Sequence, residues 1–292
     1  MNRIYPWLIF GVISLFLVLS CDKSPDSPEY EKEITVFGYL WGSRPLNLDH
    51  AILIAYTQPI DQYYDLEKAA ISNAEVTLME VGSGKVFSLS DSPEKPGFYF
   101  NDSVLIRPKE TYTLRVQVEG KSVTASTTVP PMLHLTTELR SDTVNAIFPK
   151  NISKQKPIFM QCESLEQIVL VDMYCNEEYQ NAEYINPFFD QKYPNNREEY
   201  DGGRDGEPRH IMGMARLKEM VSDDFPGQYV IDWYSSMIVF YGSNTLQVLA
   251  IDDNYHKFIY TEHPERNGGI QGGIGVLGSV CGESFELMIL KP

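Results

Sequence analysis

Apolar and polar residues alternate with a period of two through most of the chain between residues 33 and 130. In EITVFGYLW, Ile34 and Val36 alternate with polar neighbours, and AEVTLMEV, GKVFSLS, GFYFND and TYTLRVQVEGKSVTASTTVP continue the rhythm. Short runs of this kind, separated by turn residues such as the EGK at 119–121, are typical of strands joined by tight turns. The pattern predicts a mainly β protein with an antiparallel β-sandwich, immunoglobulin-like or transthyretin-like, over residues 33–130.

Two consecutive prolines, Pro130 and Pro131, end this unit, because neither residue can donate a hydrogen bond to a strand ladder. Residues 131–292 are expected to form a second β-rich domain with one or two short helices. Asp252 and Asp253 precede NYHKFIYTEH, whose apolar residues have helical spacing, and such acids cap and stabilise a helix start. HIMGMARLKEMVSDD fits either a short helix or an edge strand, and the Gly-rich NGGIQGGIGVLGSV favours close backbone approach near a final strand.

A long loop is predicted within the second domain, over residues 181–210, where no period is sustained. Aromatic residues interleaved with Asn and Asp are typical of a carbohydrate or peptide contact surface, although the same rings could simply pack on the β structure. A second aromatic stretch, AYTQPIDQYYDLEKAA, is a candidate for the same rim. The candidate ligand-contact residues are Tyr63, Tyr64, Tyr184, Phe188, Phe189, Tyr193 and Tyr200.

The amino terminus predicts where the protein is sent. Residues 1–20 hold one cation, Arg3, and a short apolar block, which are the proportions of a secretory signal, and the block ends at Cys21. This junction is similar to the lipobox of bacterial lipoproteins, in which the cysteine is acylated and becomes the mature amino terminus. Residues 21–32 are rich in Pro, Ser and acids and are expected to be a flexible tether. An ordinary cleaved signal and an uncleaved anchor are the alternatives.

The charge of the chain limits the classes of partner that the protein is expected to bind. A formal net charge of −16, without a cluster of Lys or Arg, argues against a nucleic acid partner, since phosphate binding needs clustered cations. Two weak metal patterns, Asp252 with His256 and His263, and a loop with Asp201, Asp205 and Glu207, lack the spacing of a metal site. We therefore predict no metal and no cofactor. The sequence also lacks a nucleophile elbow, a phosphate-binding loop and a dinucleotide fingerprint, so no catalytic residue is nominated.

Three further cysteines follow Cys21 in the sequence. Cys162 and Cys175 are close enough in sequence to be cross-strand neighbours in one hairpin, which would leave Cys281 single. A disulfide between Cys162 and Cys175 and a set of three free thiols are both open.

The lipobox, the first strand ITVFGYL, the sandwich block from AEVTLME to STTVP and the late GGIQGGIGVLGSV together resemble an uncharacterised family of envelope lipoproteins, a domain-of-unknown-function family. Its members are often encoded beside TonB-dependent outer-membrane receptors. The resemblance implies a lipid-anchored protein of the cell envelope, in the outer rather than the inner membrane, with the membrane face left open. It also implies a non-catalytic accessory or ligand-binding module that works with such a receptor. A hydrolase acting on glycan or peptide is the alternative, and a purely structural role in the envelope is a third.

Overall fold

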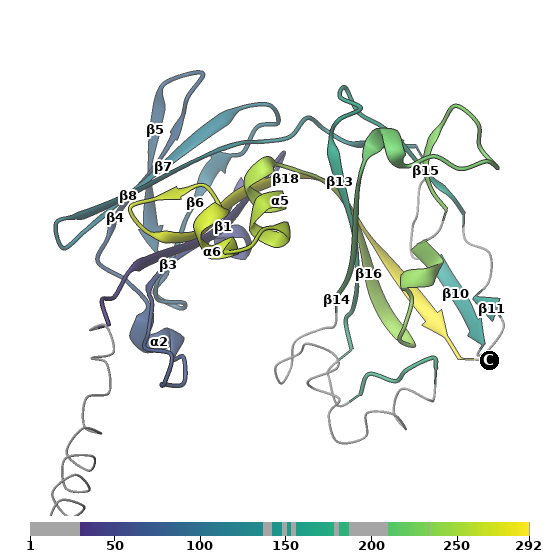
Figure 1. Cartoon of the computed structure of the whole chain (residues 1–292), viewed down its shortest axis with the longest axis horizontal. Coiled ribbons are helices and arrows are strands. Elements are labelled where there is room, and N and C mark those ends of the chain that lie inside the picture. Colours follow the sequence, from purple (N-terminus) through teal and green to yellow (C-terminus); the bar gives the residue numbers. More distant parts are fainter. Residues whose placement is uncertain are drawn as a thin grey trace, which may run out of the picture.

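The computed structural model of the chain describes residues 30–136, 142–147, 151–152, 156–177, 181–186, 210–232 and 234–291. Within these residues the protein is mainly β, as predicted, and consists of two β-rich parts that share one long strand (Figure 1). The strands before Pro130 are β1 (Ile34–Trp41), β2 (Pro45–Leu46), β3 (Ile52–Tyr56), β4 (Glu75–Glu80), β5 (Lys85–Asp91), β6 (Phe98–Leu105), β7 (Thr111–Val118) and β8 (Lys121–Thr128). Those after it are β9 (His134–Leu135), β10 (Asp142–Ile147), β11 (Asn151–Ile152), β12 (Ile158–Gln161), β13 (Ile168–Cys175), β14 (His210–Arg216), β15 (Tyr229–Ile231), β16 (Gly242–Ile251), β17 (Ile270–Gln271) and β18 (Ile274–Leu290). The helices are η1 (Leu48–His50), α2 (Leu66–Ala69), η2 (Leu217–Glu219), η3 (Tyr234–Met237), α5 (Asp253–Tyr260) and α6 (Pro264–Asn267).

The first part is the predicted sandwich, made from one sheet that curls back on itself. Its strands follow the order β1-β3-β6-β5-β4-β7-β8, and β5 pairs with β4 over most of its length and with β6 at its end. The inward residues form one hydrophobic cluster that includes Ile34, Val36, Leu78 and Leu114. The period of two in the sequence thus becomes one buried and one outer face on each strand.

The turn between β7 and β8 is a two-residue hairpin, as EGK predicted. Val118 pairs with Lys121, and the two residues between them have positive φ angles of 49° at Glu119 and 77° at Gly120. Positive φ at both central positions fits the right-handed twist of the flanking strands. A second local feature ties the preceding loop: the Tyr112 hydroxyl accepts the backbone N–H of Arg107 at 2.9 Å, the tyrosine corner of Greek-key sandwiches.

The second part has a separate core. β14, β13, β16 and β18 form antiparallel neighbours, and the three-stranded sheet β15-β12-β9 covers one face of them. The cluster between these layers includes Val171, Val248, Phe285 and Tyr234. HIMGMAR is an edge strand, β14, followed by the short helix η2, so the strand alternative for this segment is confirmed.

One strand joins the two parts. The first half of β18 pairs in parallel with β1, from Ile274 opposite Thr35 to Val280 opposite Trp41, and its second half pairs antiparallel with β16. The sheet is therefore continuous from β14 to β8, and Leu277 of β18 is buried in the core of the first part. Residues beyond Pro130 also contribute to the first part: Leu277 lies in its cluster, β17 pairs with β8, and Asp252 accepts the Thr127 hydroxyl.

The last helices occupy the bend of this sheet. α5 begins where expected: Asp252 is its N-cap, and its carboxylate accepts the Tyr255 N–H at 3.0 Å. α5 packs on β18, and α6 follows before β17 adds to the edge of β8 (Figure 1). Among the described residues no helix is both long enough and apolar enough to span a bilayer.

Candidate functional site

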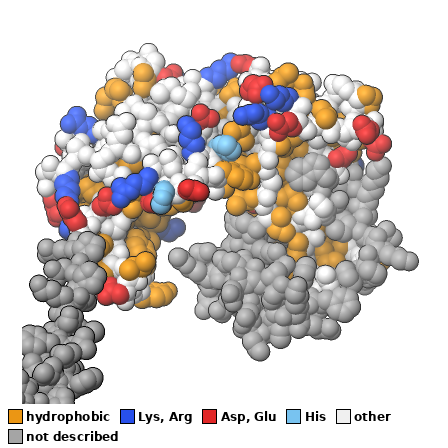
Figure 2. Space-filling view, viewed as in Figure 1, with side chains coloured by type: hydrophobic (Ala, Val, Ile, Leu, Met, Phe, Trp, Pro, Cys, Tyr) orange, Lys and Arg blue, Asp and Glu red, His pale blue; other side chains and the backbone are white. Residues whose placement is uncertain are grey.

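The central cleft, of about 470 Å³, lies where the two parts meet and contains side chains from both. It is hollowed beneath the region of α5, and hydrophobic side chains follow the strands of the second part along one wall (Figure 2). Its lining includes Phe37, Tyr39, Trp41, Asp49, His50, Leu53, Phe98, Asp172, Met212, Gln247, Leu249, Tyr255 and Val280. Because it is built from β1 and β13 alike, it exists only when both parts are folded together.

The wall on the first part is aromatic because strand β1 is apolar on both faces. Val36 and Leu40 point into the sandwich, while the alternating residues Phe37, Tyr39 and Trp41 lie on the other face and line the cleft. Phe37 remains 41% exposed. Large rings left accessible on a rigid strand offer contact area at low entropic cost, which is the property of a binding surface.

The wall on the second part is the outer face of its large sheet. Asp172 of β13, Met212 of β14 and Gln247 of β16 lie in register across three neighbouring strands. Asp172 is 5% exposed, whereas Met212 is 48% exposed. A flexible, polarisable thioether beside amide and carboxylate groups lets this wall adapt to apolar and polar parts of a ligand.

Helix α5 closes the cleft at the bend of the sheet. The rings of Tyr39 and Tyr255 meet with centroids 4.5 Å apart, and Phe37 meets Phe258 edge to face at 5.3 Å. Burial, followed by the charge of Asp172, raises the pKa of Tyr255 to about 12. Burial, with Tyr255 and Asp252 nearby, also raises the pKa of Tyr39. Both phenols therefore stay protonated at neutral pH, so each hydroxyl is available to donate a hydrogen bond to a ligand.

The other end of the cleft holds a stacked trio of side chains. The Arg44 guanidinium carbon lies 4.3 Å from the Trp41 ring centroid, and the His50 ring stacks on Trp41 at 5.3 Å. Burial and the Arg44 charge lower the pKa of His50, so the imidazole is neutral at pH 7. Trp41, His50 and Asp49 line this end of the cleft, and the Arg44 cation is held against Trp41.

A second, more polar pocket of about 620 Å³ opens further along the same strands, at the start of α5. Asp252 contributes to its lining and joins three elements: its carboxylate accepts the Thr127 hydroxyl at 2.6 Å, the Ser279 N–H at 3.1 Å and the Tyr255 N–H. Burial raises the pKa of Asp252, although these hydrogen bonds oppose the rise. Since its hydrogen bonds hold α5 to β8 and β18, we interpret Asp252 as a structural latch beside the cleft.

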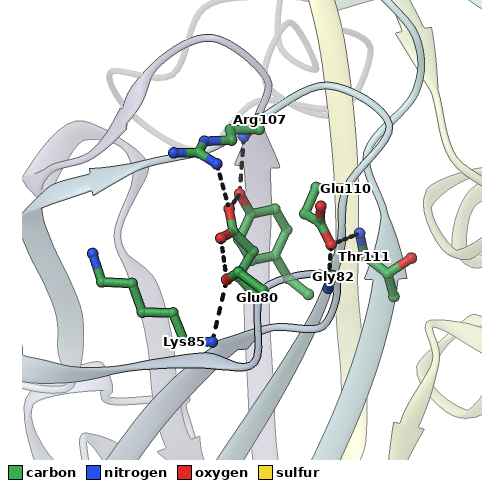
Figure 3. A network of polar contacts seen from close by, with 8 residues as sticks. Glu80, Gly82, Lys85, Arg107, Glu110 and Thr111 are labelled. Carbon is green, nitrogen blue, oxygen red and sulfur yellow. Dashed lines mark hydrogen bonds and ion pairs between the residues drawn. The ribbon is translucent and has the colours of Figure 1, made fainter.

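A polar network of the first part lies at the end of the sandwich (Figure 3). The buried Glu80 carboxylate accepts the Ser83 hydroxyl at 2.5 Å and the Tyr112 hydroxyl at 3.4 Å, and it lies 3.7 Å from the Arg107 guanidinium. The Ser83 hydrogen bond, with Arg107, lowers the pKa of Glu80. Glu110 accepts the Gly82 N–H of the same turn at 2.7 Å. These partners belong to the β4–β5 turn, the β6–β7 loop and the start of β7, and none lines the cleft, so the network stabilises the sandwich end.

The structure separates the aromatic residues that the sequence grouped as ligand contacts. Tyr63 is 94% exposed and Tyr64 45% exposed on the loop before α2, in the first part. Tyr184 is buried in the second part, with its ring 4.5 Å from that of Phe240, which is the packing role left open for these rings. The lipidation candidate Cys21 and four predicted contact residues lie outside the described residues: Phe188, Phe189, Tyr193 and Tyr200.

The three cysteines among the described residues are free thiols, so of the two alternatives left open the disulfide between Cys162 and Cys175 is not formed in this structure. Cys162 follows β12 in the three-stranded sheet, whereas Cys175 ends β13 in the large sheet. The two residues are therefore not neighbours in one hairpin, as the pairing required. Cys281 is buried on β18, and its thiol lies 3.7 Å from the Met132 sulfur.

The weak metal patterns gain no geometric support from the part of the chain that the structure describes. No three His, Cys, Asp or Glu side chains come together there as a metal site would require. Asp252 is committed to its capping hydrogen bonds, while His263 begins α6 with an exposed side chain. The acidic loop with Asp201, Asp205 and Glu207 lies outside the described residues.

Sequence reasoning missed Trp41, Tyr39, His50 and Tyr255 as site residues. One signal was available: FGYLW places three rings at alternating positions of a strand whose other face is also apolar. A strand with two apolar faces must cover them with two different partners. Here one face meets the sandwich core and the other meets the cleft and α5.

The fold and the cleft define a class: a mainly β protein of two parts on one continuous sheet, with an aromatic cleft at their junction. The sequence model of one family, Domain of unknown function (DUF4249), matches residues 24–273, and the chain belongs to this family. No curated protein matches the chain.

Proposed function

We propose that this protein is a non-catalytic, lipid-anchored module of the cell envelope that binds a ligand in the central cleft and works with a TonB-dependent outer-membrane receptor. The signal-like residues 1–20 followed by Cys21 support the anchor. The envelope-lipoprotein family that the sequence resembles supports the location and the receptor. The cleft supports the binding role.

The observation that carries the binding role is the accessible aromatic wall of β1 opposite β13, β14 and β16. A cavity of a few hundred Å³ with mostly apolar walls and a few fixed polar groups is the usual form of a small-molecule site. Tyr39 and Tyr255 stay protonated, so they donate hydrogen bonds rather than act as bases. The arrangement suits recognition of a ligand with a flat or aliphatic body and hydrogen-bond acceptors.

Charge refines the ligand class. The net charge of the chain is −16, and Asp49 and Asp172 both line the cleft. The Arg44 cation lies against Trp41, where a ring already faces it. Neutral or cationic ligands are therefore favoured over polyanions, because like charges raise the cost of binding.

The test is a pull-down of the lipidated protein from gently solubilised envelope, with mass spectrometry of both the proteins and the small molecules that accompany it. We expect an outer-membrane receptor with the wild type. Trp41→Ala should retain the receptor and lose the small molecule, whereas the matched control Val221→Ala, at a position 63% exposed outside the cleft lining, should lose neither. Absence of any receptor under several detergents would refute the accessory role. Turnover of a glycan or peptide by the purified chain would replace the binding role with the hydrolase alternative.

A further inference from the structure

The loop before α2 exposes an unusual amount of apolar surface. The apolar loop, residues 58–66, presents Ile60 and Tyr63 with exposed fractions of 105% and 94%, and Tyr64 and Leu66 with 45% and 36%. Single exposed hydrophobic residues are common, but several in one short loop mark a contact surface. These side chains do not belong to the hydrophobic cluster of the first part and do not line the central cleft.

Hydrogen bonds hold the two ends of the apolar loop together, so its tip stays exposed without packing on the protein. The Gln58 side chain donates to the Asp65 carbonyl at 2.8 Å and accepts the Asp65 N–H at 2.7 Å, which closes the loop as a bridge between strands would. Asp65 then caps α2 through the Lys68 N–H at 3.3 Å. The buried Ala69 and Ile71 fix the outgoing chain to the sandwich. A loop held open in this way binds without a large ordering cost.

The apolar loop lies beside the place where the amino-terminal tether reaches the domain. The Tyr30 hydroxyl lies 2.7 Å from the Thr57 hydroxyl, and the Thr57 N–H donates to the Glu33 carbonyl at 2.9 Å. α2 and its loop protrude from the end of the first part at which β1 begins (Figure 1). Tyr30 is nine positions after Cys21, so the chain between them spans at most about 30 Å when fully extended. A lipid on Cys21 therefore keeps the apolar loop close to the bilayer.

We propose that the apolar loop is a second membrane contact, in which Ile60 and Tyr63 enter the interfacial region of the bilayer that holds Cys21. Tyrosine with an aliphatic neighbour is the composition that bilayer interfaces favour. Residues 58–69 hold three acids, Asp61, Asp65 and Glu67, and one cation, Lys68, which is paired with Asp65 at 2.6 Å. The contact is therefore hydrophobic, prefers zwitterionic lipid and resists salt. It rests on the proposed lipid anchor for its proximity to the membrane, and it would fix the orientation of the first part.

The experiment places a fluorescent probe in the loop. Lipidated full-length protein carrying Tyr63→Trp is incorporated into phosphatidylethanolamine–phosphatidylcholine vesicles whose acyl chains are brominated in one preparation and plain in the other. The matched control is Val221→Trp, at an exposed position between η2 and β15 in the second part. We expect the added emission of Tyr63→Trp to shift to the blue and to be quenched at least about two-fold by brominated lipid, at low salt and at 0.5 M salt, as hydrophobic insertion requires. Val221→Trp should show neither change.

The same variants are also held on nickel-chelating vesicles by a polyhistidine tag in place of Cys21. If lipidated protein fails to join vesicles while the tagged Tyr63→Trp is still quenched, the lipid anchor is wrong and the loop contact stands. Emission of Tyr63→Trp that is unquenched on both kinds of vesicle would overturn the proposal. If the loop were protected only when envelope proteins are added, its partner would be a protein, and the membrane-contact proposal would be overturned. Quenching that disappears at 0.5 M salt would overturn the proposal as well.

Discussion

Asp252 provides the sharpest test of how the two parts are held together. Replacing it with alanine removes the N-cap of α5, which costs about 1 kcal/mol. It also removes the acceptor of the Ser279 N–H, which lies on a residue with no exposed surface, and a buried donor left unpaired costs about 1–3 kcal/mol. Thr127 keeps a partner, because its hydroxyl also lies 2.7 Å from that of Ser279. Relief from burying a carboxylate offsets part of the loss, so we expect Asp252→Ala to lower the free energy of unfolding by about 2–3 kcal/mol.

The neighbouring Asp253 is a matched control. Its side chain is 81% exposed and lies 3.8 Å from Lys257 in an i,i+4 pair, so Asp253→Ala should change the free energy of unfolding by less than about 0.5 kcal/mol. Urea unfolding of both variants, followed by fluorescence and by far-ultraviolet circular dichroism, measures the difference. If the two variants fell within 0.5 kcal/mol of each other, the latch role of Asp252 would be wrong.

The remaining predictions concern charge, backbone and thiols. Burial raises the pKa of Asp252, so its contribution to the free energy of unfolding is complete below the ordinary pKa of aspartate, near 4. That contribution is lost as the pH rises through the pKa of the folded state. Asp252→Asn should therefore gain stability relative to wild type between pH 4 and pH 7, as measured by parallel urea titrations. The pKa of Glu80 is lowered, so Glu80→Gln should cost about 1–2 kcal/mol at pH 7, and the cost should shrink as the pH falls below about 4; a constant difference would contradict the network. Gly275 has a φ of 113°, and a Cβ added there would lie 2.1 Å from the Val36 carbonyl oxygen. Gly275→Ala should therefore lower the free energy of unfolding by about 3–5 kcal/mol in thermal or urea unfolding. The control Gly84→Ala, where an added Cβ meets open space, should cost about 1 kcal/mol. Thiol titration of the unfolded chain without Cys21 should find all three thiols free, with the half-buried Cys162 reacting first in the folded protein; a single thiol would restore the disulfide.

The candidate site shows why a binding surface is harder to predict than a strand. The sequence nominated Tyr63 and Tyr64 as ligand contacts because they stand together in a polar stretch. The structure places them on an exposed loop that does not line the cleft. Trp41 and Tyr255, which do line the cleft, are more than 200 residues apart in sequence and meet only because β18 brings α5 back to β1. Composition reports which side chains suit a ligand, but it carries no information on which of them converge.

The network around Glu80 gives a second example. Its members come from the β4–β5 turn, the β6–β7 loop and β7, and each looks in the sequence like an ordinary surface residue. Only their convergence makes Glu80 a buried carboxylate with its hydrogen bonds satisfied. A chain with forty acids offers no local sign of which one is buried.

The sequence by itself determined the local features: the strands of the first part, the hairpin turn at 119–121, the start of α5 after Asp252 and the mainly β class. These depend on interactions between residues a few positions apart, namely the period of two, the residues that accept positive φ and the capping side chain. The tertiary structure decided that β18 pairs in parallel with β1 and antiparallel with β16, that Cys162 and Cys175 lie in different sheets, and that a cleft forms at the bend. Parallel pairing needs a long connection, and here more than 200 residues separate the two strands, so the pairing is chosen by which apolar faces remain uncovered when both cores close.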